Sequence, residues 1–360
     1  MRDGWRVARL GDVSDVHWGD TNTTKKSYTS TGFCAFSASG PDGFLPQAAY
    51  HESGVVVSAI GAKCGKTWLA NGNWSCIKNT IRILGRGAEA DVGFLYWALK
   101  DPSVWPIRGS AQPFIAQTDA RNIRVVLPPM EEQRRIARVL GALGDLIDIN
   151  ELLASAASTL AKSLCATALS DVPLDVSAHV VATTQFQPTG MVDHYSIPVY
   201  DSSRLPERVE GSAIHSAKQR LEAPSVLVSR LNPQTSRVWM AYPSASVTCG
   251  ASTEFLVLGP RDGVAVEEVW AVCSAPKFQE QMLARVTGTT GSHQRVDKAA
   301  IASLLVSDVR QLPSETRAAV VSLVKEAHES LVAARDLSLV RDELLPFLLT
   351  GAIRVDEVAV

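Results

Sequence analysis

Two kinds of apolar pattern alternate along the chain. Residues 1–128 and 171–311 contain short apolar runs, such as Gly54–Ile60, which are separated by turns rich in Gly and Pro. Short runs with many β-branched residues are typical of strands. We therefore predict a β-rich domain over each range, with a short helix at Phe94–Leu99 in the first and at Val266–Leu283 in the second.

Residues 129–170 and 312–360 have a helical pattern instead. One helix is predicted from Met130 to about Leu169, and another from the N-cap residue Ser314 to Pro346, where it should end or kink. Within both helices, apolar positions step alternately by three and four residues, which is the heptad seam of a coiled coil. The first seam also includes Asn150, a polar residue of the kind that fixes register. The predicted seams are Ile136, Val139, Leu143, Leu146, Asn150, Leu153, Ala157, Leu160 and Leu164 in the first helix, and Val320, Val324, Ala327, Leu331, Ala334, Ser338, Arg341 and Leu345 in the second.

The order of β-rich domain and long helix thus occurs twice. Val57, Ser58, Trp68 and Ala70 recur 171 residues later as Val228, Ser229, Trp239 and Ala241, respectively. Two helices that each carry one apolar seam most simply pack against each other. The predicted fold class is α+β, with two β-rich domains separated and joined by two long helices that form an antiparallel coiled coil.

The composition is that of a folded protein, because 46% hydrophobic and 20% charged residues exclude wholesale disorder. No apolar run approaches the roughly 18 residues of a membrane span, and the first residues lack the apolar core of an export signal. The six cysteines form no Cys-x-x-Cys pair, so reduced thiols, no metal site and a cytoplasmic location are expected. The net charge is −2, although residues 1–128 carry 14 Lys and Arg against 10 Asp and Glu.

Two similar modules held apart by a spacer suit a target with two separated features, and duplex DNA is such a target. Both β-rich regions carry basic and amide side chains on loops, and these groups contact phosphates and base edges in DNA complexes. The same residues could instead be solvated loop positions. The candidate DNA-binding residues are Lys25, Lys26, Lys63, Lys66, Lys78, Asn79, Ser110 and Gln112 in the first region, and Lys218, Arg220, Arg230, Asn232, Thr289, Thr290, Ser292, His293, Gln294 and Arg295 in the second.

A catalytic function has weaker support. Cys64 lies between Lys63 and Lys66, which could lower the pKa of its thiol, and His17 or His51 could act as its base. No nucleophile signature surrounds this cysteine. The stretch Gly61–Thr67 ends in Gly-Lys-Thr but has the wrong Gly-to-Lys spacing for a phosphate-binding loop. The other alternative is a coiled-coil scaffold that bridges other proteins without direct sequence-specific DNA binding.

Several segments resemble one protein family. LPPMEEQRRIARVLGALGDLIDIN (Leu127–Asn150) resembles the central conserved helix of the specificity subunits of type I restriction–modification systems. GWRVARLGDV and Gly109–Pro129 resemble the start and end of that family's first target-recognition domain. EGSAIHSAKQRLEAPSVLVSRLNP, ASTEFLVL and VTGTTGSHQRV resemble a second such domain, and RDELLPFLLTGAIRV resembles the C-terminal conserved region. The second long helix departs from the pattern, because it starts Leu-Pro-Ser-Glu-Thr-Arg and lacks the Glu-Gln pair of the first.

The resemblance implies a division of the chain into target-recognition domains at 1–128 and 171–311, a central helix at 129–170 for spacing and partner docking, and a C-terminal helix at 312–360 that pairs with it. It implies a subunit without catalytic residues or a cofactor of its own. Such a subunit binds double-stranded DNA and two methyltransferase subunits, which would hold S-adenosylmethionine, and in some systems a restriction or translocating subunit. The implied partner contacts are Glu132, Gln133, Arg134, Ile136, Asn150 and Leu345.

Overall fold

A computed structural model describes residues 4–286 and 294–355. The chain divides into two compact units: unit 1 comprises residues 1–146 and 337–360, and unit 2 comprises residues 147–336. Both long helices are shared between the units. The predicted four-part division at 1–128, 129–170, 171–311 and 312–360 treats each helix as a separate segment, and it stays a prediction.

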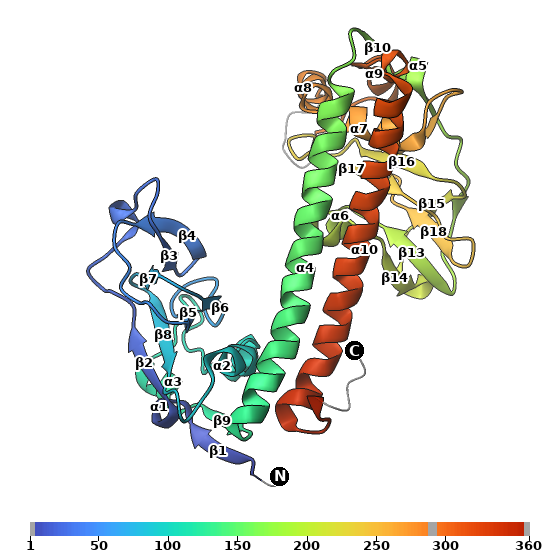
Figure 1. Cartoon of the computed structure of the whole chain (residues 1–360). Helices are drawn as coiled ribbons and strands as arrows, with labels where there is room; N and C mark the ends of the chain where they lie inside the picture. Colours follow the sequence, from blue (N-terminus) through green and yellow to red (C-terminus); the bar gives the residue numbers. More distant parts are fainter. Residues whose placement is uncertain (1–3, 287–293, 356–360) are drawn as a thin grey trace. The chain divides into compact units, whose positions relative to one another are not determined.

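Unit 1 contains two small sheets and a separate two-stranded ladder of β1 and β9 (Figure 1). The larger has the strand order β2-β8-β5-β6 and the smaller the order β4-β3-β7. Val57 of β5 faces Ile81 of β8 in the antiparallel ladder, and both are fully buried together with Phe94 of α2. The elements are β1 (Arg6–Arg9), α1 (Leu10–Val13), β2 (Ser14–Trp18), η1 (Lys25–Ser27), β3 (Phe33–Ser37), β4 (Gly40–Leu45), β5 (Gly54–Ser58), β6 (Thr67–Ala70), β7 (Trp74–Cys76), β8 (Thr80–Gly85), α2 (Val92–Ala98), η2 (Pro102–Val104), α3 (Gln117–Asn122) and β9 (Arg124–Leu127).

Unit 2 contains a four-stranded sheet of order β11-β19-β16-β17 and a five-stranded sheet of order β12-β15-β18-β13-β14. Val228 of β16 faces Leu256 of β19, and both side chains belong to the unit's main core. The elements are β10 (Asp171–Pro173), α5 (Leu174–Ser177), β11 (Ala178–Val180), β12 (Gln185–Phe186), β13 (Met191–Tyr195), α6 (Ile197–Ser203), β14 (Glu207–Glu210), η3 (Gly211–Ala213), β15 (Lys218–Leu221), β16 (Ser225–Ser229), β17 (Val238–Ala241), β18 (Thr248–Ala251), β19 (Phe255–Pro260), α7 (Val266–Cys273), α8 (Pro276–Ala284), α9 (Lys298–Ala302), β20 (Leu305–Ser307) and η5 (Val309–Gln311).

The predicted duplication is visible in the strand order. The sheet β2-β8-β5-β6 of unit 1 has the same connectivity as β11-β19-β16-β17 of unit 2. The hairpins β5–β6 and β16–β17 are separated by 171 residues at both strands, which is the offset at which Val57, Ser58, Trp68 and Ala70 recur. The prediction of two β-rich domains with one repeated plan is confirmed.

The long helices are α4 (Met130–Cys165) and α10 (Ser314–Thr350). In unit 1, Ile136 and Leu140 of α4 share a core with Leu348 of α10. In unit 2, Ala154 and Ala157 of α4 cluster with Ala327 of α10. The start of α4 therefore meets the end of α10, and the end of α4 meets the start of α10, so that the predicted antiparallel pairing is confirmed (Figure 1).

The predicted seam of α4 is wrong at every second position. Leu146, Leu153 and Leu160 are between 43% and 50% exposed, whereas the residues that follow each of them, Ile147, Ala154 and Ala161, are buried. Shifting these positions by one residue keeps the heptad spacing, because a step of three and a step of four exchange places. The small alanines let the two helices pack closely at these positions. The α10 seam agrees better with its prediction, since Val320, Val324, Ala327 and Ala334 are all buried.

Two further predictions are corrected by local packing. Helix α10 continues past Pro346 to Thr350, so Pro346 does not end the helix, and a kink at this residue stays a prediction. A proline removes a single backbone donor, and Leu348 in the following turn is fully buried in the unit 1 core. The single helix predicted over Val266–Leu283 is two helices, α7 and α8, because Pro276 takes the first position of α8 and begins a new helix.

Candidate nucleic-acid interface

Two of the lysines predicted in unit 1, Lys25 and Lys63, contact the β3–β4 hairpin. Lys25 lies in η1, and its Nζ is 2.5 Å from Oδ2 of Asp42. Lys63, from the β5–β6 hairpin, donates from Nζ to the carbonyl oxygen of Ser39 at 2.9 Å. Burial opposes ionisation of Asp42, but hydrogen bonds from Lys25, Ser37 and Tyr28 lower the pKa of its carboxyl overall. Asp42 therefore stays ionised and holds Lys25 in place beside Ser39.

An aromatic side chain lies beside another of the predicted lysines, Lys66. Nζ of Lys66 is 5.9 Å from the ring centroid of Trp68. Gly40 has a φ of 116°, and a Cβ at this position would lie 3.1 Å from the same indole ring. The close approach of backbone and ring explains why a glycine is needed here. Trp68 is partly buried and packs against a small core cluster that includes Phe36 and Trp74.

Two more loops complete the cluster in unit 1. Asn79 has a φ of 67°, and its carbonyl oxygen accepts a hydrogen bond from the amide of Ala59 at 2.9 Å. The amide of Gly61 donates to the carbonyl oxygen of Pro113 at 2.9 Å, and a bridge joins Ile60 to Phe114. The folding of these loops onto the β5–β6 hairpin brings together residues that are far apart in sequence. We define the unit 1 loop cluster by these loops. The predicted residues Lys25, Lys63, Lys66 and Asn79 make the contacts described above, and the other predicted residues, Lys26, Lys78, Ser110 and Gln112, lie on the same loops in the sequence.

Unit 2 repeats this arrangement at the equivalent hairpin. The amide of Asn232 donates to the carbonyl oxygen of Gln294 at 2.9 Å, and a bridge joins Leu231 to Arg295. Asn232 and Leu231 follow Gly61 and Ile60 at the offset of 171 residues, and both Asn232 and Gly61 have a left-handed φ. The same hairpin thus contacts the same returning segment in each unit.

Acidic and basic groups meet in this second loop cluster. The Arg295 guanidinium is 2.6 Å from a carboxylate oxygen of Glu254. The amide of Arg230 donates to the carbonyl oxygen of Glu254 at 3.2 Å, and the carbonyl oxygen of Arg230 accepts from Val296 at 3.2 Å. We define the unit 2 loop cluster by Arg230, Asn232, Glu254, Gln294 and Arg295. The remaining candidates of this region, Thr289, Thr290, Ser292 and His293, lie outside the described residues.

Two other candidates are on β15 and have partners within the chain. Lys218 is 6% exposed, and its Nζ donates to the carbonyl and the hydroxyl oxygen of Ser216 at 3.0 Å and 2.5 Å. Burial lowers the pKa of this ammonium group. The Arg220 guanidinium stacks 4.4 Å from the ring centroid of Phe186. Neither side chain belongs to the unit 2 loop cluster, and the Lys218 ammonium group is bonded to Ser216 of its own chain.

The contacts around Cys64 do not support a nucleophilic role for its thiol. Lys63 bonds to Ser39 and Lys66 lies by Trp68, while Sγ of Cys64 contacts the carbonyl oxygen of Ala59 at 3.5 Å. Burial raises the pKa of the Cys64 thiol, which is the opposite of what a nucleophile requires. Within residues 4–286 and 294–355, no group of three or more His, Cys, Asp or Glu side chains could hold a metal ion.

The candidate partner contacts on the helices fall into two groups. Gln133 and Ile136 are 2% and 1% exposed in the core of unit 1, and Leu345 packs against the same core. Gln133 and Ile136 therefore stabilise this chain itself and cannot reach a partner without local unfolding. Arg134 is exposed, whereas Glu132 and Asn150 are partly buried. Sequence reasoning missed an exposed apolar stripe on α4, which comprises Ile149, Leu152, Leu153 and Leu160 at 58%, 70%, 43% and 50% exposure.

Each β-rich unit thus has a loop cluster on the same hairpin, and the two long helices pair in antiparallel orientation. Residues 2–156 match the family described as type I restriction modification DNA specificity domain. The match includes Leu127–Asn150, so that it confirms the resemblance seen in that segment. No curated protein matches the chain. In the described part of the chain, no helix is both long enough and apolar enough to span a bilayer.

One solved structure extends the similarity of the fold to the rest of the chain. The crystal structure of a type I restriction–modification S subunit from M. genitalium is 16% identical, has a TM-score of 0.66, and is matched over 97% of both chains. This chain therefore shares the fold of that subunit. The HsdS subunit from Thermoanaerobacter tengcongensis is 17% identical over 98% of both chains with a TM-score of 0.35. A chain from a study of complex assembly and conformational transition of the type I R-M system is 18% identical over 98% of both chains with a TM-score of 0.37.

Proposed function

We propose that this chain is the DNA-recognition subunit of a type I restriction–modification system, and that each unit reads one half of a split target. The observation that carries the proposal is the repeated loop cluster. Both clusters sit on equivalent hairpins, contact an equivalent returning segment, and carry Lys or Arg together with Asn or Gln. Lys and Arg neutralise phosphates, and Arg, Asn and Gln can donate to the edges of guanine and adenine.

In this proposal the chain binds DNA and does not catalyse the methylation reaction. The Cys64 thiol is the one nucleophile that the sequence suggested, and burial raises its pKa. The methyl group and the base-flipping pocket would belong to methyltransferase subunits, which would bind S-adenosylmethionine. The chain itself would take no cofactor, and its target would be double-stranded DNA.

The exposed stripe Ile149, Leu152, Leu153 and Leu160 supports docking of a methyltransferase subunit on α4. Apolar side chains gathered on one face of a helix are typical of an interface that a partner covers. Arg134 and Asn150 remain candidate contacts on the same helix. Gln133 and Ile136 are no longer candidates, because the chain buries them itself.

The proposal is tested with the chain bound to its methyltransferase subunit. We expect the complex to methylate adenines in duplexes that contain two short sequence elements at a fixed gap. The logarithm of the affinity should fall steeply with the logarithm of the salt concentration, by about 0.9 for each phosphate contacted. A complex that binds no duplex even at low salt would contradict the proposal and favour the scaffold alternative.

A further inference from the structure

The two long helices begin at junctions with the β-rich part of their own unit. Gln133 is the fourth residue of α4. Its Oε1 accepts a hydrogen bond from the amide of Asp91 at 2.8 Å, and its Nε2 donates to the carbonyl oxygen of Pro128 at 2.9 Å. Asp91 is the N-cap of α2, where its carboxylate accepts from the amide of Phe94. We call Gln133 with these two partners the first junction. Its hydrogen bonds join the uncharged side-chain amide of Gln133 to backbone groups.

The second junction is made by a different pair of residues at the equivalent place. Arg317 is the fourth residue of α10. Its Nε and one terminal nitrogen lie 2.6 Å and 2.7 Å from the two carboxylate oxygens of Glu268. The same carboxylate accepts from the amide of Ala265 at 2.7 Å, and Ala265 is the N-cap of α7. Arg317 also donates to the carbonyl oxygen of Gly263 at 2.5 Å.

These junctions are counterparts in the duplicated fold. Helix α2 follows β8, and helix α7 follows β19, which is the equivalent strand of the other unit. In both units the N-cap amide of this short helix donates a hydrogen bond to a side-chain oxygen. The acceptor is Gln133 in unit 1. In unit 2 the acceptor is Glu268, which is itself bonded to Arg317. The missing Glu-Gln pair at the start of the second long helix is therefore not a lost contact. The ion pair between Arg317 and Glu268 lies where unit 1 has the side-chain amide of Gln133.

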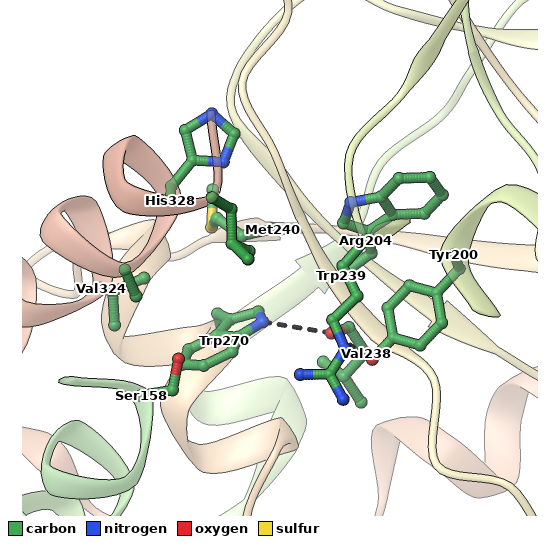
Figure 2. Close-up of a pocket in the computed structure, with 11 residues that line it drawn as sticks. Ser158, Tyr200, Arg204, Val238, Trp239, Met240, Trp270, Val324 and His328 are labelled. Atoms are coloured by element: carbon green, nitrogen blue, oxygen red, sulfur yellow. Dashed lines mark hydrogen bonds between the residues drawn. The ribbon is translucent and has the colours of Figure 1, made fainter. Parts of the chain in front are cut away.

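The packing beyond the second junction is incomplete. Figure 2 shows a pocket between β17, α7 and the long helices of unit 2, lined among others by Trp239, Trp270 and His328. Its cavity volume is about 70 Å³. Trp270 of α7 closes one side and donates from its indole N–H to the carbonyl oxygen of Val238 at 3.2 Å (Figure 2). Because a cavity leaves the facing side chains with fewer contacts, packing alone fixes α7 on α10 less firmly than a filled core would.

We propose that Gln133 and the Arg317–Glu268 pair are positioning residues, which fix the β-rich part of each unit on its long helix. They act at a distance from DNA by holding each loop cluster at a set angle to the helix. The Glu268 side chain is 1% exposed, and that of Arg317 is 28% exposed. A carboxylate buried to this extent needs its cation, so the second junction works only with both residues present. The consequence for DNA rests on the proposed function, whereas the consequence for local structure does not.

The test uses the full chain in complex with its methyltransferase subunit. The variants are Arg317→Gln, Glu268→Gln and the double variant, which would rebuild a neutral junction like the first. Lys325→Gln is the matched control, because Lys325 also lies on α10 and its Nζ is 3.8 Å from the neighbouring Glu267, but its side chain is 54% exposed. Two properties are measured: amide hydrogen exchange over residues 263–268, and methylation of duplexes whose gap is correct or is changed by one base pair.

We expect exchange at the Ala265 amide to rise at least tenfold in Arg317→Gln, to return most of the way in the double variant, and to stay unchanged in Lys325→Gln. Discrimination against the altered gap should fall in Arg317→Gln and recover with the double variant. If exchange rises but discrimination does not change, the junction is only structural and the proposal is overturned. Unchanged exchange in Arg317→Gln overturns it as well. If Arg317→Gln does not fold, the double variant decides alone, because it must then fold and keep the discrimination of the native chain.

A failure of the positioning role can be distinguished from a failure of the proposed function. If the native complex methylates no split target, the proposed function fails, and the exchange measurements still show whether the second junction holds Ala265. If the native complex methylates a split target and the variants behave like Lys325→Gln, only the positioning role fails.

Discussion

Replacing Leu140 with Ala tests the corrected seam of α4. Leu140 is fully buried in the unit 1 core, whereas Leu152 on the same helix is 70% exposed. Leu140→Ala and Leu152→Ala remove the same three carbon atoms and change helix propensity equally, so that only burial differs between them.

The expected magnitudes follow from burial. At about 0.8 kcal/mol for each buried carbon, Leu140→Ala loses roughly 2.4 kcal/mol of transfer free energy, and the residual cavity raises the total to about 2–5 kcal/mol. About 30% of the Leu152 surface is covered, so its transfer term is roughly 0.7 kcal/mol and a cavity term is not expected. Leu140→Ala should therefore reduce the free energy of unfolding at least threefold more than Leu152→Ala.

The assay must report on each unit separately, because Leu140 lies in unit 1 and Leu152 in unit 2, and a chain of two units need not unfold in one step. Native-state hydrogen exchange at the amides of Val55 and Ile83, two fully buried residues of central strands, measures the opening of unit 1. Exchange at the amides of Val226 and Leu227, two fully buried residues of β16, measures the opening of unit 2. Equal destabilisation by the two variants, or a greater effect of Leu152→Ala, would refute the seam described above. A second expectation concerns the complex: Leu152→Ala should weaken binding of the methyltransferase subunit.

Three further predictions concern unit 1 and the helix pair. Lys63→Gln should weaken DNA binding regardless of sequence and reduce the salt slope by about one, whereas Lys100→Gln, outside the loop cluster, should leave the slope unchanged in the same titration. Cys64→Ser should leave methylation by the complex unchanged, because burial raises the pKa of this thiol, and a lost methylation step with DNA binding intact would contradict this. Burial and the nearby Arg335 lower the pKa of His328 below its ordinary value of 6.5, so the unfolded chain binds a proton that the folded chain does not. The free energy of unfolding of unit 2 should fall as the pH drops below 6.5, and His328→Gln should remove part of this loss in urea titrations at about pH 8 and about pH 5.5.

The fold class could be predicted because long-range regularities are strong in this sequence. A heptad pattern held over many turns predicts a paired helix, and Val57, Trp68 and their counterparts Val228 and Trp239 mark the same hairpin twice. The exact seam could not be predicted, since Leu153 and Ala154 both satisfy a heptad. The larger side chain is the more hydrophobic choice, but close packing of two helices favours the smaller one.

The candidate interface could be predicted only in part. The hairpin loops stand out because Lys63, Asn232 and their neighbours interrupt apolar runs with basic, amide and glycine residues. The pairing of Lys25 with Asp42 and the enclosure of Lys218 depend on strands far away in sequence, so local patterns carry no signal for them. Gln133 was assigned to a partner because the family motif contains it, but the structure shows that it bonds to Asp91 and Pro128 of its own unit.

The central claim is that the two units read separate halves of one DNA target. The most direct measurement maps methylated adenines genome-wide in cells that carry the native chain or the variant Arg230→Ala with Arg295→Ala. We expect a split motif in which only one half loses its sequence preference, at a cost of about 1–3 kcal/mol for each base contact removed. A continuous motif, or a variant that changes both halves equally, would contradict the account.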